Sequence, residues 1–346
     1  MLNINEQKKP NNTMFYGVFY RQVCTLLFIL IGISACSPSN VQSSVASKTH
    51  RFGETTIEAA AISTDGQYSL IADSQQVCLW ENLQYQKLAP CIAGKEAENI
   101  ELVGISESKE YFYTSNQMTV YLYRLNSKRE LRTVNVWYAD NNIINDIAIS
   151  ANGSTLLLGY RNGQASIINT LTGNKSAFQQ HRLDINAVAL SNDGAIAFTG
   201  SSDKTAVLWH TKSGEKLKTF QHRTRVNHVD ISPDGKLGFT IDSINDRAFW
   251  LLDSIEEAQV SELQTNLKFL EINHSAFSTD KQYFLTGSPK QKIMLWRVSD
   301  GELIGEWQSA KVGRSSVLQV TFLSNKQIAI ITSDGNYQQF PLSLVE

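Results

Sequence analysis

Long runs of like charge are missing from this sequence. Its 31 Lys and Arg residues are balanced by 33 Asp and Glu residues, and both signs are spread along the chain. A protein that grips a polyanion needs a basic stripe, so nucleic acid is not an expected partner. The composition, 42% hydrophobic and 18% charged, excludes a disordered chain and is typical of a packed globular protein.

Clusters of metal ligands and catalytic motifs are missing as well. The histidines occur singly, without the close His, Cys or carboxylate spacing of a zinc site: His50, His181, His210, His222, His228 and His274. Asp242, Asn245 and Asp246 make a small acidic turn, but they offer too few oxygen ligands for a calcium loop. No Gly-x-Ser-x-Gly elbow is present. We therefore expect no metal, no cofactor and no catalytic residues.

No apolar run reaches the roughly 20 residues that a membrane-spanning helix needs. Residues 23 to 33 form a shorter uncharged run that follows Arg21 and fits the apolar region of an export signal. The polar lead from Met1 to Thr13 is long for such a signal. A start at Met14 would give a more usual one, and it stays open as the true start of the chain.

The residues that close this run, Ile33-Ser34-Ala35-Cys36, resemble the lipobox of bacterial lipoproteins. The resemblance implies that residues 1–35 are a removed signal peptide and that Cys36 is lipidated, with residues 36–44 as a short tether. Ser37 is not the aspartate associated with inner-membrane retention. In a Gram-negative source the resemblance therefore implies the outer membrane, facing the periplasm. An ordinary cleaved signal with an incidental cysteine is the alternative.

A repeated pattern governs the rest of the chain. Turn dipeptides recur, some strong and some weak, at Asp65-Gly66, Ser108-Lys109, Asn152-Gly153, Asp193-Gly194, Asp234-Gly235, Asp280-Lys281 and Asn325-Lys326. They lie 41 to 46 residues apart. A bulky apolar residue follows each by 15 or 16 positions: Trp80, Tyr123, Ile168, Trp209, Trp250, Trp296 and Phe340. The short apolar runs between turns predict four antiparallel strands in each of seven units.

A four-stranded sheet cannot bury both of its apolar faces alone, so neighbouring units must cover one another. The sequence therefore predicts an all-β fold, a seven-bladed β-propeller of four-stranded antiparallel blades, over residues 45–346. The seventh unit ends after its third strand, and Val41 to Thr49 has the alternation to supply the fourth. We expect this N-terminal strand to close the ring.

The fourth unit carries a specific resemblance. Gln180-His181, Ser191-Asn192-Asp193-Gly194, the segment from Gly200 to Thr205 and Leu208-Trp209 are similar to the WD-repeat pattern. His210 stands where that family usually has Asp after the tryptophan. The fifth unit carries His222 and Trp250 but has Ile244 where the turn aspartate would fall. The resemblance implies a WD-repeat β-propeller, with the other units looser copies.

His181, Ser201 and Asp203 are the residue types of a hydrolase triad. A buried Trp209 needs an acceptor for its indole N–H, and a relay from Trp209 through Ser201 and His181 to Asp203 would satisfy every member. In the WD-repeat family such a network is structural. We therefore interpret His181, Ser201, Asp203 and Trp209 as a structural tetrad rather than as a catalytic site.

Cys78 and Cys91 remain after the signal is removed. Export would place them in an oxidising compartment, where a disulfide can persist. A hairpin turn near residues 84 and 85 would bring them almost opposite each other. Two interpretations stay open: a disulfide between them, or two buried thiols that act as small apolar side chains.

In WD-repeat propellers, the loops entering the first strands and the turns between second and third strands meet on one rim, where partners often dock. The resemblance places a candidate docking rim at Tyr160, Arg161, Arg182, Asp184, Ser202, Lys204, Arg223, Arg225, Arg247, Lys290 and Lys292, with Trp137 and Tyr138 nearby. Arginine and aromatic side chains are common interface anchors. The rim would suit an acidic or mixed-charge protein.

These observations favour a lipid-anchored, non-enzymatic scaffold that mediates protein–protein interaction in the bacterial cell envelope. Its partners would be envelope proteins, and a lipid on Cys36 would hold it to the membrane. The alternative is a propeller enzyme or small-ligand binder that uses the central channel. The first is favoured because no convergent set of acids, histidines or metal ligands occurs outside the tetrad.

Overall fold

The computed structural model describes residues 41–88, 90–244, 246–254, 258–267, 269–310, 315–324 and 326–343. The export signal, Cys36 and most of the expected tether lie outside the described residues. Within the described part of the chain, no helix has the length and apolar character needed to cross a bilayer.

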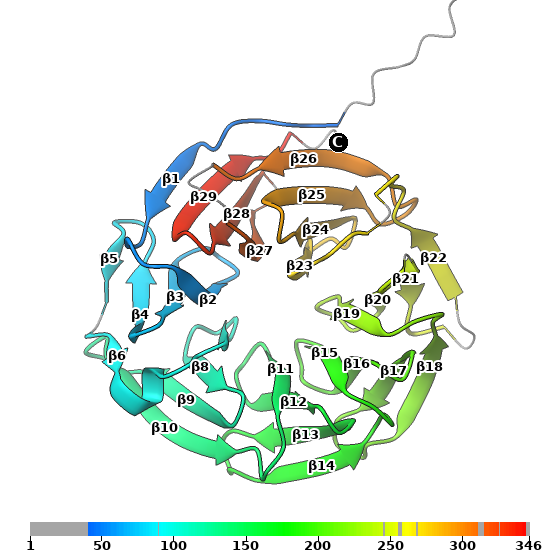
Figure 1. The fold of residues 1–346 in the computed structure, drawn as a ribbon, viewed down its shortest axis with the longest axis horizontal. Coiled ribbons are helices and arrows are strands. Elements are labelled where there is room, and N and C mark those ends of the chain that lie inside the picture. Colours follow the sequence, from blue (N-terminus) through cyan, green and yellow to red (C-terminus); the bar gives the residue numbers. More distant parts are fainter. Residues whose placement is uncertain are drawn as a thin grey trace, which may run out of the picture. The chain divides into compact units, whose positions relative to one another are not determined.

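Seven antiparallel sheets are arranged in a ring around a central axis, which confirms the predicted seven-bladed β-propeller (Figure 1). In every sheet the first strand lies nearest the axis and the last strand lies at the outer edge. We number the blades I to VII in chain order. Blade I carries one additional short strand at its edge.

The strands of a blade are consecutive in sequence except in blade VII. Blades I and II contain β2 (Ile57–Ile62), β3 (Tyr68–Asp73), β4 (Gln76–Glu81), β5 (Gln86–Lys87), β6 (Ile92–Ala93), β7 (Leu102–Ile105), β8 (Tyr111–Asn116), β9 (Thr119–Leu125) and β10 (Leu131–Tyr138), with a short 3-10 helix η1 (Gly94–Ala97). Blades III and IV contain β11 (Ile144–Ile149), β12 (Thr155–Tyr160), β13 (Gln164–Asn169), β14 (Lys175–Gln179), β15 (Ile185–Leu190), β16 (Ile196–Ser201), β17 (Thr205–His210) and β18 (Lys216–Gln221).

The remaining blades follow the same order. Blades V and VI contain β19 (Val226–Ile231), β20 (Leu237–Asp242), β21 (Arg247–Leu251), β22 (Ala258–Glu262), β23 (His274–Phe277), β24 (Tyr283–Gly287), β25 (Lys292–Arg297) and β26 (Leu303–Gln308). Blade VII contains β27 (Val317–Ser324), β28 (Gln327–Thr332), β29 (Asn336–Pro341) and β1 (Lys48–Arg51).

The turn dipeptides found in the sequence connect the first and second strands of the blades. The turn glycines have positive φ, between 71° and 74°: Gly66, Gly153, Gly194 and Gly235. At two weaker markers Lys109 and Lys281 adopt the same left-handed conformation, with φ of 58° and 62°. In blade IV this connection is an Asx turn. Asp193 Oδ1 accepts hydrogen bonds from the Ser191 hydroxyl at 2.6 Å and from the Ala195 amide at 2.9 Å.

Neighbouring blades bury their facing sides together. One cluster joins Phe198 and Leu208 of blade IV to Val226 and Val229 of blade V. The bulky residues predicted from the repeat all lie in the third strands, at Trp80, Tyr123, Ile168, Trp209, Trp250, Trp296 and Phe340. Because each sheet is covered by the next, the ring supplies the burial that a single blade lacks.

The N-terminal segment closes the ring, as predicted. β1 pairs antiparallel with β29 and completes blade VII. The closing strand begins later than the predicted Val41 to Thr49, because the preceding residues follow the outer strand of blade VI instead. There Gln42 forms a parallel bridge with Gly305, and Trp307 Nε1 donates to Ser44 Oγ at 3.0 Å.

Candidate functional site

The loops that enter the first strands and the turns between second and third strands meet on one side of the ring, which we call the loop face. Backbone hydrogen bonds join the two kinds of segment within a blade. In blade IV, Ser202 N donates to Asp184 O at 2.9 Å, and in blade V, Ser243 N donates to Arg225 O at 3.1 Å. The loop face is therefore a braced surface rather than a set of independent loops.

The structure places most of the predicted rim on this face. Exposed cations come from blades III to V: Arg161, Arg182, Lys204, Arg223 and Arg225. Asp184 and Ser202 are half-buried beside them, and Lys290 is exposed in blade VI. Blades I and II instead present Glu58 and Glu101 near the channel. The exposed cations of the predicted rim thus gather on blades III to VI.

Two residues that the sequence predicts on the exposed rim are instead buried. Tyr160 is 1% exposed at the end of β12, so its ring is core. Arg247 is 9% exposed, because its guanidinium turns inward and donates to the carbonyl oxygens of Leu267 at 3.0 Å and Thr265 at 2.9 Å. Arg247 therefore braces the loop before blade VI and cannot serve as a contact for a partner. Trp137 is also buried.

Sequence reasoning missed the apolar part of the loop face. Phe269 is 69% exposed in the long connection between β22 and β23, and Ile244 is 56% exposed in the neighbouring turn of blade V. Phe269 borders one cavity of about 140 Å³ with Arg225 and Ser243. It also borders a second cavity of about 80 Å³ with Pro289 and Lys290. The signal in the sequence was the 46-residue interval between the markers at 234 and 280, the longest in the repeat.

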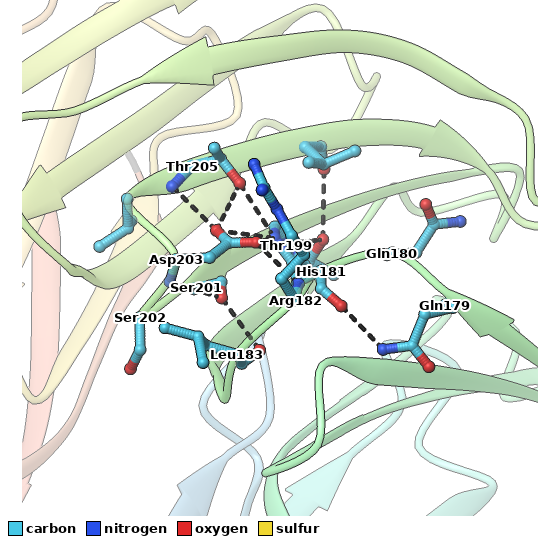
Figure 2. Close-up of polar contacts among 12 residues, drawn as sticks. Gln179, Gln180, His181, Arg182, Leu183, Thr199, Ser201, Ser202, Asp203 and Thr205 are labelled. Atoms are coloured by element: carbon cyan, nitrogen blue, oxygen red, sulfur yellow. Dashed lines mark hydrogen bonds and ion pairs between the residues drawn. The ribbon is translucent and has the colours of Figure 1, made fainter.

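The predicted tetrad exists in blade IV with one member exchanged, and Figure 2 shows its members His181, Thr199 and Asp203. Trp209 Nε1 donates to Thr199 Oγ1 at 3.3 Å, and His181 Nε2 lies 2.8 Å from the same oxygen. His181 Nδ1 lies 3.2 Å from the Asp203 carboxylate. The hydroxyl of the network therefore belongs to Thr199, not to Ser201 as expected.

Strand register explains the exchange. Trp209 stands opposite Ala197 in the β16–β17 pair, so Thr199 is the next residue on the same face. Ser201 lies at the end of the strand, where its hydroxyl donates to Leu183 O at 3.1 Å. Thr199, His181 and Trp209 are buried, which leaves a substrate no access to the network.

Asp203 anchors this network. Burial alone would raise the pKa of its carboxyl, but hydrogen bonds from His181, Thr205 and the Arg182 amide hold it far below the ordinary value. Thr205 Oγ1 donates at 2.6 Å and the Arg182 amide donates at 2.9 Å. The carboxylate thus ties together the loop before the blade and the turn within it.

Blade V departs from this arrangement at the equivalent positions. The His222 amide donates to Lys204 O, just as the His181 amide donates to Gly163 O one blade earlier. Ile244 replaces the turn aspartate, and carboxylates stand two residues to either side, at Asp242 and Asp246. One ligand atom from each of His222, Asp242 and Asp246 lies within 4.8 Å of the other two.

The central channel encloses a cavity of about 580 Å³ lined by the first strands of the blades. Burial raises the pKa of Asp146 and of Asp230 to about 7. Burial also lowers the pKa of His228 to about 3. Ser275 Oγ donates to Asp230 Oδ2 at 2.6 Å, and His228 Nε2 lies 2.7 Å from that serine oxygen. Asp230, Ser275 and His228 thus form a chain of hydrogen bonds in the channel wall.

Asparagines at one repeat position brace the channel wall from blade to blade. Asn145 Nδ2 donates to Ile185 O at 2.9 Å and Asn186 Nδ2 donates to Val226 O at 2.8 Å. Asn273 Nδ2 donates to Val317 O at 3.0 Å. Asn145 and Asn186 are the second residues of their innermost strands, and Asn273 directly precedes β23. Asparagines at the start of the innermost strands thus support the ring, a role that aligning the repeat units would have revealed.

Of the two interpretations of the cysteines, the structure contains the disulfide: Cys78 is joined to Cys91. Cys78 is buried in β4, and Cys91 directly precedes β6, which pairs with the same strand. The bridge fastens the outer edge of blade I. It lies away from the apolar part of the loop face.

Residues 173–210 match the family model described as "WD domain, G-beta repeat". The matched segment runs from the turn before β14 to the end of β17, so it contains His181, Thr199, Asp203 and Trp209. No curated protein shows a significant match to the chain. The match and the ring of seven blades together identify a WD40 repeat within a β-propeller.

Proposed function

We propose that this WD40-repeat β-propeller is a non-enzymatic scaffold that binds a protein partner through its loop face. WD40 propellers generally bind protein partners, and the observation that carries the proposal is a joint apolar and basic surface on blades V and VI. We call it the docking patch and define it by Arg223, Arg225, Ile244, Phe269 and Lys290. Each of these side chains is exposed.

The docking patch has the chemistry of an interface centre. Phe269 offers a large rigid side chain between two small cavities that an apolar residue of a partner can enter. Arg223 and Arg225 flank it, and the Arg225 guanidinium is oriented by a 2.9 Å hydrogen bond from Nε to Ser243 Oγ. The partner segment that fits is acidic with at least one bulky apolar residue.

We further propose that the protein is anchored to a bacterial membrane by a lipid on Cys36. The support is the lipobox-like Ile33-Ser34-Ala35-Cys36 after an apolar run. Gln42 N donates to Ile304 O at 2.8 Å, so the chain is held to blade VI from there onward. Cys36 precedes Gln42 by six residues, which span at most about 20 Å. The propeller would therefore remain close to the membrane surface and meet envelope proteins.

Charge reversal tests the docking patch. Cross-linking in native membranes should capture one reproducible protein, and Arg223→Glu with Arg225→Glu should abolish the capture. The matched control is Leu171→Glu, because Leu171 is exposed on the opposite side of the ring, in the turn after β13. Capture that survives the double reversal would refute the patch.

The anchor has a separate test. Cys36→Ser should release the protein from membranes into the aqueous phase of a detergent partition. Unchanged partitioning would refute lipidation and would leave the docking patch untouched.

The channel supports a second candidate, binding of a small polar ligand. Half-buried Asp146, Asp230 and His228 line a cavity of about 580 Å³. Ionisable groups withdrawn from water destabilise a fold, so their presence in a cavity favours a role in ligand binding. Ligand binding or turnover that disappears in Asp230→Asn, with no protein captured at the docking patch, would favour this candidate.

A further inference from the structure

We propose that His222, Asp242 and Asp246 form a binding site for one divalent transition-metal ion, with Zn²⁺ as the representative ion. The site lies in blade V, on the loop face. Its ligands are distinct from the side chains of the docking patch, although Arg223 of that patch lies 3.7 Å from Asp246.

The turn between β20 and β21 is a direct counterpart of the turn in blade IV. Ile241 pairs with Arg247 across residues 242–246, as Gly200 pairs with Ala206 across residues 201–205. Asp242 therefore occupies the position of Ser201, and Asp246 that of Thr205. The carboxylate that closes the blade IV network is replaced by two carboxylates, one on either side of Ile244 in the sequence.

The distances suit a shared ion. The imidazole nitrogen and the two carboxylate oxygens lie within 4.8 Å of one another. Ligand atoms about 2.1 Å from a tetrahedral zinc ion lie roughly 3.4 Å apart. Small side-chain rotations bring the three groups to that spacing, and a fourth position remains for water.

His222 provides the second, independent observation. It is 9% exposed, yet within the described part of the chain neither ring nitrogen has a hydrogen-bond partner. Buried polar atoms without partners are rare and call for an unplaced water or ion. Thr224 Oγ1 is another buried atom without a hydrogen-bond partner among the described residues. The backbone amide of Thr224 donates to Asp242 Oδ2 at 3.1 Å, so this residue lies beside the site.

The electrostatics of the site also favour a cation. Asp242 Oδ1 accepts the amides of Ile244 at 2.9 Å and Asp246 at 3.0 Å, which hold the carboxylate in place. Arg223 Nε lies 3.7 Å from Asp246 Oδ2, but its side chain is largely exposed and does not fill the site. His222 offers an imidazole nitrogen beside these two carboxylates, which is a common ligand set for a divalent transition metal.

One nitrogen and two carboxylate oxygens select for the borderline transition ions rather than for calcium, which prefers six to eight oxygen ligands. The sequence interpretation, a solvated acidic turn without metal, did not include His222, because that residue lies 20 positions before Asp242. The repeat brings them together, since the loop entering a blade meets the turn inside it.

Calorimetric titration of the full chain tests the site, with no histidine tag and after treatment with EDTA. We expect one equivalent of Zn²⁺, with affinity at least tenfold weaker in Asp246→Asn and at least a hundredfold weaker in His222→Ala. Asp246→Asn keeps the shape of the turn and serves as the test if His222→Ala fails to fold. His210→Ala is the matched control, because His210 is an exposed histidine of blade IV.

Two further readouts separate the site from nonspecific binding. Zn²⁺ should raise the melting temperature of the wild type and of His210→Ala, but not that of Asp246→Asn. Co²⁺ should give visible absorption bands that His222→Ala removes. Absence of micromolar binding, or affinity that survives both His222→Ala and Asp246→Asn, would overturn the proposal.

Discussion

Blades IV and V share a framework and differ at its centre. Both have a histidine at the entrance, a five-residue turn and a tryptophan that donates to a threonine ten residues earlier, at 3.3 Å in blade IV and 2.7 Å in blade V. In blade IV the turn carries Asp203, and in blade V it carries Ile244. The position of a single carboxylate therefore decides whether the histidine is enclosed in a structural network or left without a partner.

The same difference separates structural from functional surface. In blade IV the polar groups of the tetrad form hydrogen bonds with one another, so few donors or acceptors remain for a ligand. In blade V the turn exposes Ile244, and His222 faces two carboxylates. Where a repeat unit departs from the pattern and leaves polar groups without hydrogen bonds inside the blade, that unit is expected to bind another molecule. Both proposed sites lie at this departure.

The largest effect should come from the tryptophans that the two blades share. Trp209 is fully buried and Trp250 is half-buried. Trp209→Ala should therefore lower the free energy of unfolding by about 3–5 kcal/mol, and Trp250→Ala should lower it by less. Denaturant unfolding measures both. A wild-type midpoint for Trp209→Ala would contradict the burial of this residue.

A double-mutant cycle sharpens the comparison at the histidines. His181 and Asp203 should show a coupling free energy of about 1–3 kcal/mol, since the buried His181 is hydrogen-bonded to the half-buried Asp203. In EDTA, His222 and Asp242 should couple by less than about 0.5 kcal/mol. Equal coupling in the two blades would mean that Ile244 does not open the blade V network.

The smallest effect concerns pH, and the two blades should respond in different ranges. Asp203 has a pKa below its ordinary 3.8, so its stabilisation is complete above that pH and is lost as the pH falls below it. His222 has a pKa below its ordinary 6.5, so the unfolded chain takes up its proton first and stability falls as the pH drops below 6.5.

Unfolding of two variants at several pH values separates these contributions. Asp203→Asn should flatten the stability profile below about pH 4, and His222→Gln should flatten it as the pH falls below about 6.5. His222→Gln with the wild-type slope in that range would contradict the buried, neutral imidazole.

The fold could be predicted because the same pattern of turn and bulky apolar residue recurs in all seven units. The spacing from each turn marker to its bulky residue locates the third strands, and turn chemistry such as Ser191 with Asp193 repeats between blades. That Thr199 and not Ser201 supplies the hydroxyl of the tetrad could not be predicted without the register of the β16–β17 pair. Both residues lie on the same face of β16, and only the pairing of Trp209 with Ala197 distinguishes them.

The candidate sites were harder to predict because they depend on breaks in the repeat. Phe269 lies in the connection between β22 and β23, which is longer than the equivalent connections of the other blades, so no strand alternation marked it. His222 was recognised as a repeat histidine, but its lack of a partner follows from burial and from side-chain distances. Arg247 was assigned to the surface by type, whereas its hydrogen bonds turn it inward.

Site-specific photo-cross-linking in native membranes tests most directly the claim that the function lies where blade V departs from the repeat. A photoreactive residue in place of Phe269 should join the protein to one partner, and the same residue in place of Leu171 should not. Equal cross-linking from both positions, or none from Phe269 where Leu171 captures a protein, would contradict the account.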